Sequence, residues 1–297
     1  MQLKQALDSA YQRFIANEVP SPRLNAEILM TFTLGRDRSF LFAHPERELT
    51  AEEQVRYEEV VTQREQGCPT QYITGHQEFW GLDLLVSPAV LIPRPETEHV
   101  VETVLELVQE HYREHHERIR IVDVGTGSGC IALALATELP QAEIHACDVS
   151  DEALEMARVN AARLGLGSRV LMRKSDLLSV YAPGTFDFVV SNPPYVGESE
   201  ADKVQKQVKD FEPKIAVFSG SEGMDIYRRL LPQALSVLRE GGWFVTEIGF
   251  SIEEKAKQLL RGWDDVRTTA DLQGIPRVIA ARKPAAQKSA TMKIALP

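Results

Sequence analysis

The sequence has few cysteines and no long apolar run. Its three cysteines, Cys68, Cys130 and Cys147, lie far apart along 297 residues. Their odd number and wide spacing predict neither a disulfide framework nor a Cys-x-x-Cys metal site, so we expect a protein of the reducing cytoplasm. No apolar stretch approaches the length of a membrane span, and the first residues lack the apolar segment of a signal peptide, so no membrane association is expected.

Positive charge is also scarce. Lys and Arg number 33 against 43 Asp and Glu, which gives a formal net charge of −10 and a pI near 5.3. Residues 1–72 alone carry 8 Lys and Arg against 11 Asp and Glu. This balance argues against direct binding of nucleic acid through phosphate contacts and favours a small-molecule cofactor and a protein partner.

Residues 1–72 show apolar repeats typical of amphipathic helices. One stripe comprises Leu3, Leu7, Tyr11 and Phe14, and a second comprises Leu24, Ile28, Leu29 and Phe32. Thr50, followed by Glu52 and Glu53, predicts a capped helix start. We expect a helical domain that docks a protein partner or only stabilises the chain, joined to the rest by a hairpin link over residues 73–95 that turns near Gly81.

Residues 96–283 alternate predicted strands with helices, which indicates an α/β domain with a doubly wound, mostly parallel sheet. The strand candidates are residues 119–124, 143–147, 169–173, 186–191, 242–248 and 277–282. The charged stretch 198–209 is expected to form a mobile loop over the site. The polar residues 284–297 are expected to form a flexible tail without an assigned function.

Three histidines near the end of the first predicted helix of this domain have a spacing that could bind a metal ion. These are His111, His115 and His116, which stand among Glu and Arg. No Cys or Asp converges with them to complete a ligand set. We therefore interpret them as part of a solvated charged face and expect no metal site.

A glycine-rich turn follows the first predicted strand of the domain. Gly125-Thr126-Gly127-Ser128-Gly129 permits a tight turn and close approach of the backbone to a ligand. Its G-x-G-x-G spacing differs from the dinucleotide pattern G-x-G-x-x-G. Because the turn holds no positive residue, it does not suit a pyrophosphate. A cationic sulfonium would instead be favoured by the nearby Asp123.

Acidic residues end the next two predicted strands. Asp148 lies 23 residues after Gly125, where an acid can bind both hydroxyls of a ribose or, alternatively, cap a helix. Ser175-Asp176-Leu177 follows the third strand, and Asp176 could accept a hydrogen bond from an adenine amino group. Three successive strand ends therefore indicate a nucleoside-containing cofactor.

The fourth strand end is the stretch around which the domain is organised. The apolar run 186–191 stops at Asn192-Pro193-Pro194-Tyr195, because proline cannot donate to a sheet ladder. A plain strand-terminating turn would explain Asn-Pro alone, but Asn-Pro-Pro-Tyr is much rarer.

This corner suits methyl transfer to a planar amide or amino nitrogen. The Asn192 carbonyl and the backbone carbonyl after it can accept both N–H groups of an –NH2 group, while Tyr195 stacks on its plane. The lone pair is then aimed at an electrophilic methyl, and positioning carries most of the catalysis without a strong base.

Together these residues resemble the class I S-adenosylmethionine-dependent methyltransferases. Within that class the chain resembles the protein-(glutamine-N5) methyltransferases that act on peptide chain release factors. The likeness also rests on Pro93-Arg94-Pro95-Glu96-Thr97-Glu98, Glu247-Ile248-Gly249 and the stretch from Asp271 to Val278. It implies a seven-stranded sheet, a cytoplasmic role in translation termination, and S-adenosyl-L-homocysteine as a product.

The resemblance also implies roles for individual residues. The substrate would be the glutamine of a Gly-Gly-Gln loop, with Asn192, Pro193 and Tyr195 catalytic and Pro194 and Arg94 helping to bind it. The implied cofactor contacts are Asp123, Gly125, Thr126, Gly127, Ser128, Gly129, Asp148, Asp176, Leu177 and Asn192. The family often has an aromatic residue where this chain has Leu177, which puts that contact in question.

Three other functions are compatible with the same motifs. The Asn-Pro-Pro-Tyr corner is shared with enzymes that methylate adenine N6 in nucleic acid, although the acidic N-terminal region argues against that substrate. A sister activity methylates a glutamine of a ribosomal protein. A regulator that binds the cofactor without catalysis is the third, and the intact Asn192 and Asp148 argue against it.

Overall fold

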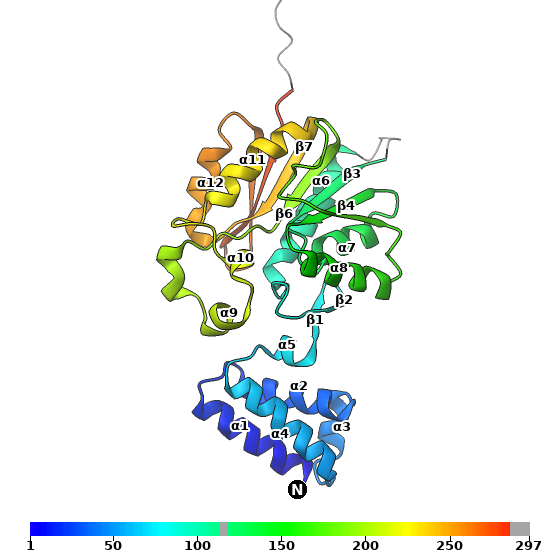
Figure 1. The fold of residues 1–297 in the computed structure, drawn as a ribbon, viewed down its shortest axis with the longest axis vertical. Helices are drawn as coiled ribbons and strands as arrows, with labels where there is room; N and C mark the ends of the chain where they lie inside the picture. Colours follow the sequence, from blue (N-terminus) through cyan, green and yellow to red (C-terminus); the bar gives the residue numbers. More distant parts are fainter. Residues whose placement is uncertain (113–117, 286–297) are drawn as a thin grey trace, which may run out of the picture.

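The computed structural model describes residues 1–112 and 118–285 of the chain. Figure 1 shows a small helical body at the N-terminal end and a larger α/β body, with a two-stranded hairpin between them. His115, His116 and residues 286–297 of the tail lie outside the described residues. Within the described ranges, no helix is long and apolar enough to cross a membrane, and no group of His, Cys, Asp and Glu suits a metal ion.

The small body contains five helices with a core of its own. They are α1 (Leu3–Ala16), α2 (Pro22–Leu34), α3 (Arg38–Ala43), α4 (Ala51–Glu65) and α5 (Thr70–Thr74). The predicted start of α4 is confirmed, since Thr50 and Glu53 form a capping box.

The predicted apolar stripe of α2 is wrong in part. Leu24, Ile28 and Phe32 are 45%, 37% and 38% exposed, whereas Leu29 is buried. The buried face instead comprises Ala26, Glu27, Leu29, Met30 and Thr33, and the Glu27 carboxylate is paired with two arginines. Hydrophobicity alone therefore selects the wrong face, because a paired charge occupies part of the core side.

The predicted hairpin turn near Gly81 is confirmed. Strands β1 (His76–Phe79) and β2 (Leu82–Leu85) are antiparallel, and Trp80 and Gly81 both have positive φ, at 55° and 69°. That geometry matches the right-handed twist of the two strands.

A seven-stranded sheet forms the larger body. Its order is β5-β4-β3-β6-β7-β9-β8, parallel from β5 to β7 and antiparallel at β9 and β8. The strands are β3 (Arg120–Val124), β4 (Glu143–Asp148), β5 (Val170–Lys174), β6 (Phe186–Ser191), β7 (Leu238–Glu247), β8 (Asp264–Ala270) and β9 (Pro276–Arg282). The doubly wound α/β fold and its six expected strands are confirmed.

Two details of the sheet differ from the strand predictions. β7 begins at Leu238, not at residue 242, and its pairing with β6 is irregular around Gly241, which has a φ of 74°. β8 was not among the strand candidates, because it is an edge strand with mostly exposed polar residues and offers no apolar alternation.

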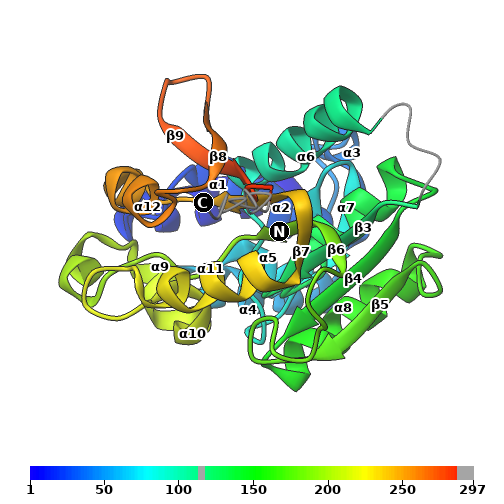
Figure 2. The same cartoon turned by 90° about the horizontal axis from the view of Figure 1, so that it is seen from above.

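Helices cover both faces of this sheet. Helices α6 (Glu98–His111), α7 (Cys130–Glu138) and α8 (Asp151–Arg163) pack with alternate strand residues such as Ile121 and Phe188. Helices α11 (Asp225–Val237) and α12 (Glu253–Leu259) pack on the opposite face with Val122 and Val189. Figure 2 shows α6 and α11 on opposite sides of the strands.

The charged stretch after β6 is helical and does not line the site, contrary to the expectation of a loop over it. It forms η2 (Glu198–Lys203) and α9 (Lys206–Phe211), followed by α10 (Lys214–Val217). Within residues 198–217, only Pro213, Ile215 and Ala216 line the cavity described below. Two further short turns are η1 (Pro95–Thr97), which starts α6 where Pro95 and Thr97 predicted, and η3 (Phe250–Ile252).

Candidate active site

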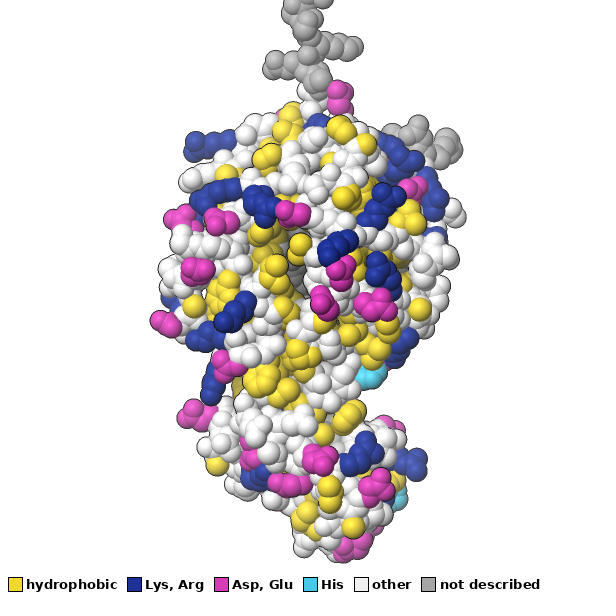
Figure 3. Space-filling model, viewed as in Figure 1, with side chains coloured by type: hydrophobic (Ala, Val, Ile, Leu, Met, Phe, Trp, Pro, Cys, Tyr) yellow, Lys and Arg dark blue, Asp and Glu magenta, His cyan; other side chains and the backbone are white. Residues whose placement is uncertain are grey.

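A cavity of about 580 Å³ opens at the carboxyl ends of the parallel strands. Residues 125–128, 148–150, 175–177 and 191–194 line it, each group following one of β3, β4, β5 and β6. This edge is where open α/β sheets bind ligands. Figure 3 shows the hollow with hydrophobic side chains gathered in it and along the surface toward the helical body.

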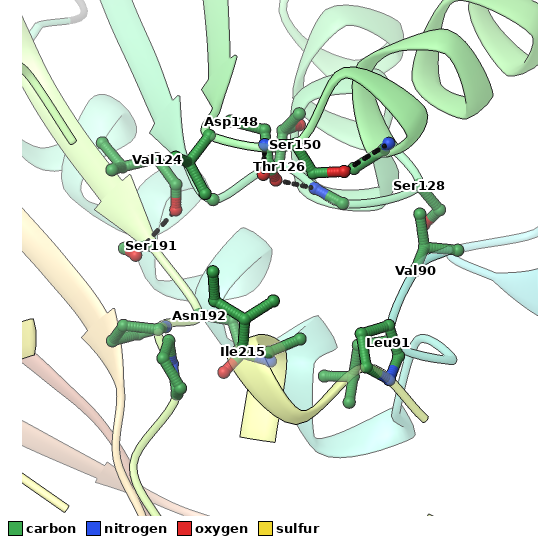
Figure 4. A pocket seen from close by; sticks show the side chains of 18 of the residues that line it. Val90, Leu91, Val124, Thr126, Ser128, Asp148, Ser150, Ser191, Asn192 and Ile215 are labelled. Atoms are coloured by element: carbon green, nitrogen blue, oxygen red, sulfur yellow. Dashed lines mark hydrogen bonds between the residues drawn. The ribbon is translucent and has the colours of Figure 1, made fainter. Parts of the chain in front are cut away.

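The two sides of the cavity differ in chemistry (Figure 4). Thr126, Ser128 and Asp148 lie on one side, and Asn192 and Ile215 lie across from them. Leu91, with Val90 beside it, comes from the segment after the hairpin and adds an apolar wall. A ligand with a polar part and a flat apolar part would be held between these sides.

The glycine turn approaches the cavity with its backbone. Gly125 and Gly127 have φ values of 72° and 55°, and apart from the adjoining residues no atom lies within 4 Å of the position that a Cβ would occupy at either one. Open space is therefore available directly over the turn. The N–H groups of Gly125 and Thr126 donate to the Cys147 carbonyl, which fixes the turn against β4. Gly129 does not line the cavity and instead precedes α7.

Asp148 lies on the cavity wall and also holds the turn. One of its oxygens accepts from the Gly127 N–H at 3.0 Å, and the other accepts from the Ser150 N–H at 3.0 Å. An ionised carboxylate has about four acceptor positions, so each oxygen keeps capacity for a ligand hydroxyl.

Asp176 and Leu177 also line the cavity. Asp176 is exposed and pairs with Arg229 of α11 at 2.6 Å. Leu177 has a φ of 54°, and its carbonyl accepts from the Cys147 thiol. The Asp176 carboxylate is therefore already held by a cation, and a ligand amino group would share it.

Asp123 lies beneath the turn and does not reach the cavity wall. It is 1% exposed, and one oxygen accepts from the Thr126 hydroxyl at 2.6 Å and the Ala132 N–H at 3.3 Å. Its other oxygen is buried with no hydrogen-bond partner among the described residues. Burial raises the pKa of Asp123 to about 7. A cation over the turn would stabilise the ionised form.

Asn192 is held by a threonine from a distant part of the chain. Its Nδ2 donates to Thr97 Oγ1 at 3.0 Å, and that hydroxyl donates to Glu247 Oε2 at 2.5 Å. The Asn192 carbonyl oxygen is left as the acceptor at the cavity, where Pro193 and Pro194 also line the wall. The arrangement can accept hydrogen bonds from a planar –NH2 group and fix its orientation.

Two residues expected to bind substrate lie behind the cavity wall. The Tyr195 hydroxyl donates to Glu247 Oε1 at 3.0 Å, and the charge of Glu247 holds the pKa of Tyr195 well above its usual range. The Arg94 guanidinium pairs with the buried carboxylate of Glu212. Neither side chain lines the cavity.

The sequence patterns missed several contributors to the site. Thr97 and Glu247 stand in stretches that carried the family resemblance, but nothing local showed that they meet each other. Asn160 is fully buried on α8 and donates to the carbonyls of Leu85 and Ser128, which ties the hairpin to the glycine turn. An asparagine in an amphipathic helix gives no signal of such a role.

Comparison with known proteins identifies both parts of the chain. A family model described as PrmC N-terminal domain matches residues 5–75, and one described as Methyltransferase small domain matches residues 100–210. A protein of Koribacter versatilis named release factor glutamine methyltransferase is 57% identical over 96% of this chain and 99% of its own length. One of the same name from Moorella thermoacetica is 42% identical over 88% and 90%.

Solved structures share the fold. The hMettl16 catalytic domain in complex with the MAT2A 3′UTR hairpin 1 has a TM-score of 0.55 at 19% identity, over 84% of this chain and 85% of that one. The N-terminal domain of human METTL16 in complex with SAH has a TM-score of 0.50 at 18% identity, over 85% and 93%. At these identities the likeness concerns the fold alone.

Proposed function

The chain belongs to the release factor glutamine methyltransferases, and from this premise we propose how its cavity performs the reaction. It is an enzyme that methylates the side-chain amide nitrogen of a release factor glutamine with S-adenosyl-L-methionine. When bound, the cofactor supplies an electrophilic methyl group. Residues of this chain bind the cofactor and orient the substrate amide.

The residues present fit this cofactor. The open space over Gly125 and Gly127 supports close approach of the ligand to the turn, and Asp148 has acceptor capacity for two ribose hydroxyls. Asp176 and Leu177 line the same cavity and would hold the adenine ring. The unpartnered oxygen of Asp123 supports a cationic ligand above it, acting through the field and not by direct contact.

The substrate amide is proposed to bind at Asn192. Its Oδ1 and the carbonyl of Pro193 accept the two N–H groups of the glutamine side chain and fix the amide plane. The observation that carries this assignment is the bond from Asn192 Nδ2 to Thr97, which leaves the carbonyl oxygen for the substrate. Tyr195 and Arg94 are proposed to support the wall from behind, through Glu247 and Glu212.

We also propose a separate role for each of three segments of the chain. Residues 1–72 dock the release factor, residues 73–95 link the two parts, and residues 96–283 bind cofactor and catalyse in the cytoplasm. The Gly-Gly-Gln loop of the release factor enters the apolar side of the cavity, between Leu91 and Ile215. The exposed Leu24, Ile28 and Phe32 of α2 support a protein-docking role for the small body.

A transfer assay with methyl-labelled cofactor tests this function. Label should enter intact release factor and fail to enter a variant whose loop glutamine is replaced by alanine. Label in a ribosomal protein, or in adenine of DNA or RNA, in place of the release factor would assign a different substrate. No transfer to any of them would contradict the proposal.

A further inference from the structure

Two buried side chains and a partly buried asparagine form a hydrogen-bonded chain that ends at the reacting amide site. Glu247, Thr97 and Asn192 belong to β7, η1 and the turn after β6. Glu247 is 3% exposed and Thr97 is 1% exposed. The Thr97 hydroxyl is 2.5 Å from Glu247 Oε2 and 3.0 Å from Asn192 Nδ2. The chain thus connects Thr97 with Asn192, which lies 95 positions later in the sequence, and with Glu247, which lies 150 positions later.

The donor and acceptor inventory gives this chain one direction. An ionised carboxylate can only accept, so the single hydroxyl proton of Thr97 is committed to Glu247. Thr97 can then only accept from its other neighbour, which must be the –NH2 group of Asn192. The carbonyl oxygen of Asn192 is therefore the group left for the substrate. A reversed amide would direct two donors at a substrate –NH2 group, which is itself a donor.

A buried carboxylate at position 247 lowers the free energy of unfolding, so stability alone does not explain the residue. Burial raises the pKa of its carboxyl group, because removal from water costs the charged form free energy, while the hydrogen bonds from Thr97 and Tyr195 favour the ionised form. The other groups around its side chain do not neutralise it by direct contact: Tyr195 donates to Oε1, and Arg277 pairs with Asp271 at 2.8 Å. Glu96, 3.7 Å from Arg277, adds negative charge. A buried glutamine would avoid the cost of the charge.

We propose that Glu247 is a positioning residue that fixes, through Thr97, the polarity of the Asn192 amide so that its oxygen faces the substrate. The inference rests on the proposed function. Glu247 touches neither substrate nor cofactor in this account. Its contribution is felt in the alignment of the substrate amide, so it should affect turnover and leave cofactor binding unchanged.

The first test is Glu247→Gln. A glutamine can donate to Thr97, which frees the threonine hydroxyl to donate in turn and allows Asn192 to reverse. We expect kcat on release factor to fall by about tenfold to a hundredfold, as for other losses of alignment, with the affinity for S-adenosylmethionine within about twofold of wild type. Calorimetry measures the affinity, and circular dichroism checks the fold.

Threonine variants separate positioning from a purely structural role. Thr97→Val keeps the shape and removes the hydroxyl, so it should lower kcat as Glu247→Gln does, whereas Thr97→Ser should restore it. Adding Glu247→Gln to Thr97→Val should cost no further turnover, because the relay is already broken. Thr103→Val is the matched control, since Thr103 is buried one to two turns along α6 and bonds to His99 and Thr269, away from the cavity.

The outcomes distinguish this inference from the function on which it rests. If wild-type enzyme transfers no methyl group to release factor, the proposed function fails. If wild type is active and Glu247→Gln keeps its turnover, or if Thr97→Ser is as impaired as Thr97→Val, the positioning role of Glu247 is overturned. Additive losses of turnover in the double variant would also overturn it.

Discussion

Asp148 has acceptor capacity to spare at the edge of the cavity. Each of its oxygens already accepts one backbone N–H, from Gly127 and from Ser150. Two ribose hydroxyls would add charge-assisted hydrogen bonds worth about 1.5–3 kcal/mol each. We therefore predict that Asp148→Ala weakens the binding of S-adenosylmethionine by at least about tenfold without changing the circular dichroism.

Calorimetry on Asp148→Ala checks this prediction, with Asp151→Ala as the control. Asp151 is a neighbouring acid that is exposed, pairs with Lys174 and does not line the cavity. Its loss should leave the affinity unchanged. Wild-type affinity in Asp148→Ala would remove Asp148 from the cofactor site.

Asp123 predicts a pH dependence of cofactor binding. Its pKa is raised to about 7, first by burial and in part by the charge of Asp148. Because a cationic ligand favours the ionised form, binding lowers this pKa, and affinity should rise with pH up to about 7 and level off above it. The stability of the ligand-free fold has the opposite pH dependence. Because the pKa of Asp123 is raised in the folded protein, Asp123 contributes to stability at low pH, and this contribution is lost as pH rises through about 7.

Asp123→Asn should flatten both profiles, because the amide does not titrate. Calorimetric titrations with S-adenosylmethionine across this pH range measure the first profile, and thermal unfolding of the ligand-free protein measures the second. An affinity that is independent of pH in wild type would show that Asp123 does not sense the cofactor charge.

At the level of residues, the sequence allowed prediction of those site positions that local pattern determines. Asp148 and Asn192 follow apolar strands directly, and parallel strands bring their carboxyl ends to one edge. Tyr195 could not be placed in this way, because the direction of its side chain depends on Glu247, 52 residues later. The partner of Asn192 is likewise contributed by a segment 95 residues away.

Among the elements, the segment from α9 to α10 touches three parts of the molecule. Gln207 accepts from Arg64 of α4 at 3.4 Å, and Ile215 lines the cavity. Between them, the buried Glu212 accepts from the Ile92 N–H at 3.2 Å and pairs with Arg94. The segment therefore joins the small helical body, the link and the active-site wall.

Glu212→Gln should loosen this junction. The amide removes the charge that holds Arg94, and losing a buried charge-assisted bond costs roughly 1–3 kcal/mol of unfolding free energy. We expect lower stability in urea and a raised KM for release factor, because the wall at Ile215 is less well fixed. Gln207→Ala, which removes the long bond from Arg64 and a bond to Gln205 but no charge, should change neither. Unchanged stability and KM in Glu212→Gln would contradict a junction role.

Elements with strong apolar patterns were predictable, and those shaped by contacts were not. The strands β3, β4 and β6 are buried on both faces and stand out in the sequence. β8 is an exposed edge that is a strand only because β9 pairs with it. The stretch 198–209 looks like a charged loop, yet backbone hydrogen bonds give it short helical turns.

In the whole molecule, the small helical body has a core separate from those of the α/β body, which implies separable tasks. The small body packs around Leu3, Phe14 and Leu29, and the cores of the α/β body share none of these residues. A chain beginning at Gln71 should therefore still fold and bind S-adenosylmethionine. It should lose most activity on intact release factor, because docking remote from the reacting amide contributes binding energy.

A short glutamine-containing peptide is the control substrate for this truncation. It cannot use a remote docking surface, so its slow methylation should be nearly the same with the full and the shortened chain. Equal activity of both chains on intact release factor would rule out docking by residues 1–72.

Locating the transferred methyl group tests the proposed reaction at Asn192 most directly. Release factor is incubated with S-adenosylmethionine and wild-type enzyme or Asn192→Ala, and its peptides are sequenced by mass spectrometry. We predict one added methyl group on the side-chain amide of the Gly-Gly-Gln glutamine with wild type, and a loss of about two orders of magnitude in its rate of formation with Asn192→Ala. An unmodified glutamine with cofactor-loaded wild type, or a normal rate with Asn192→Ala, would contradict it.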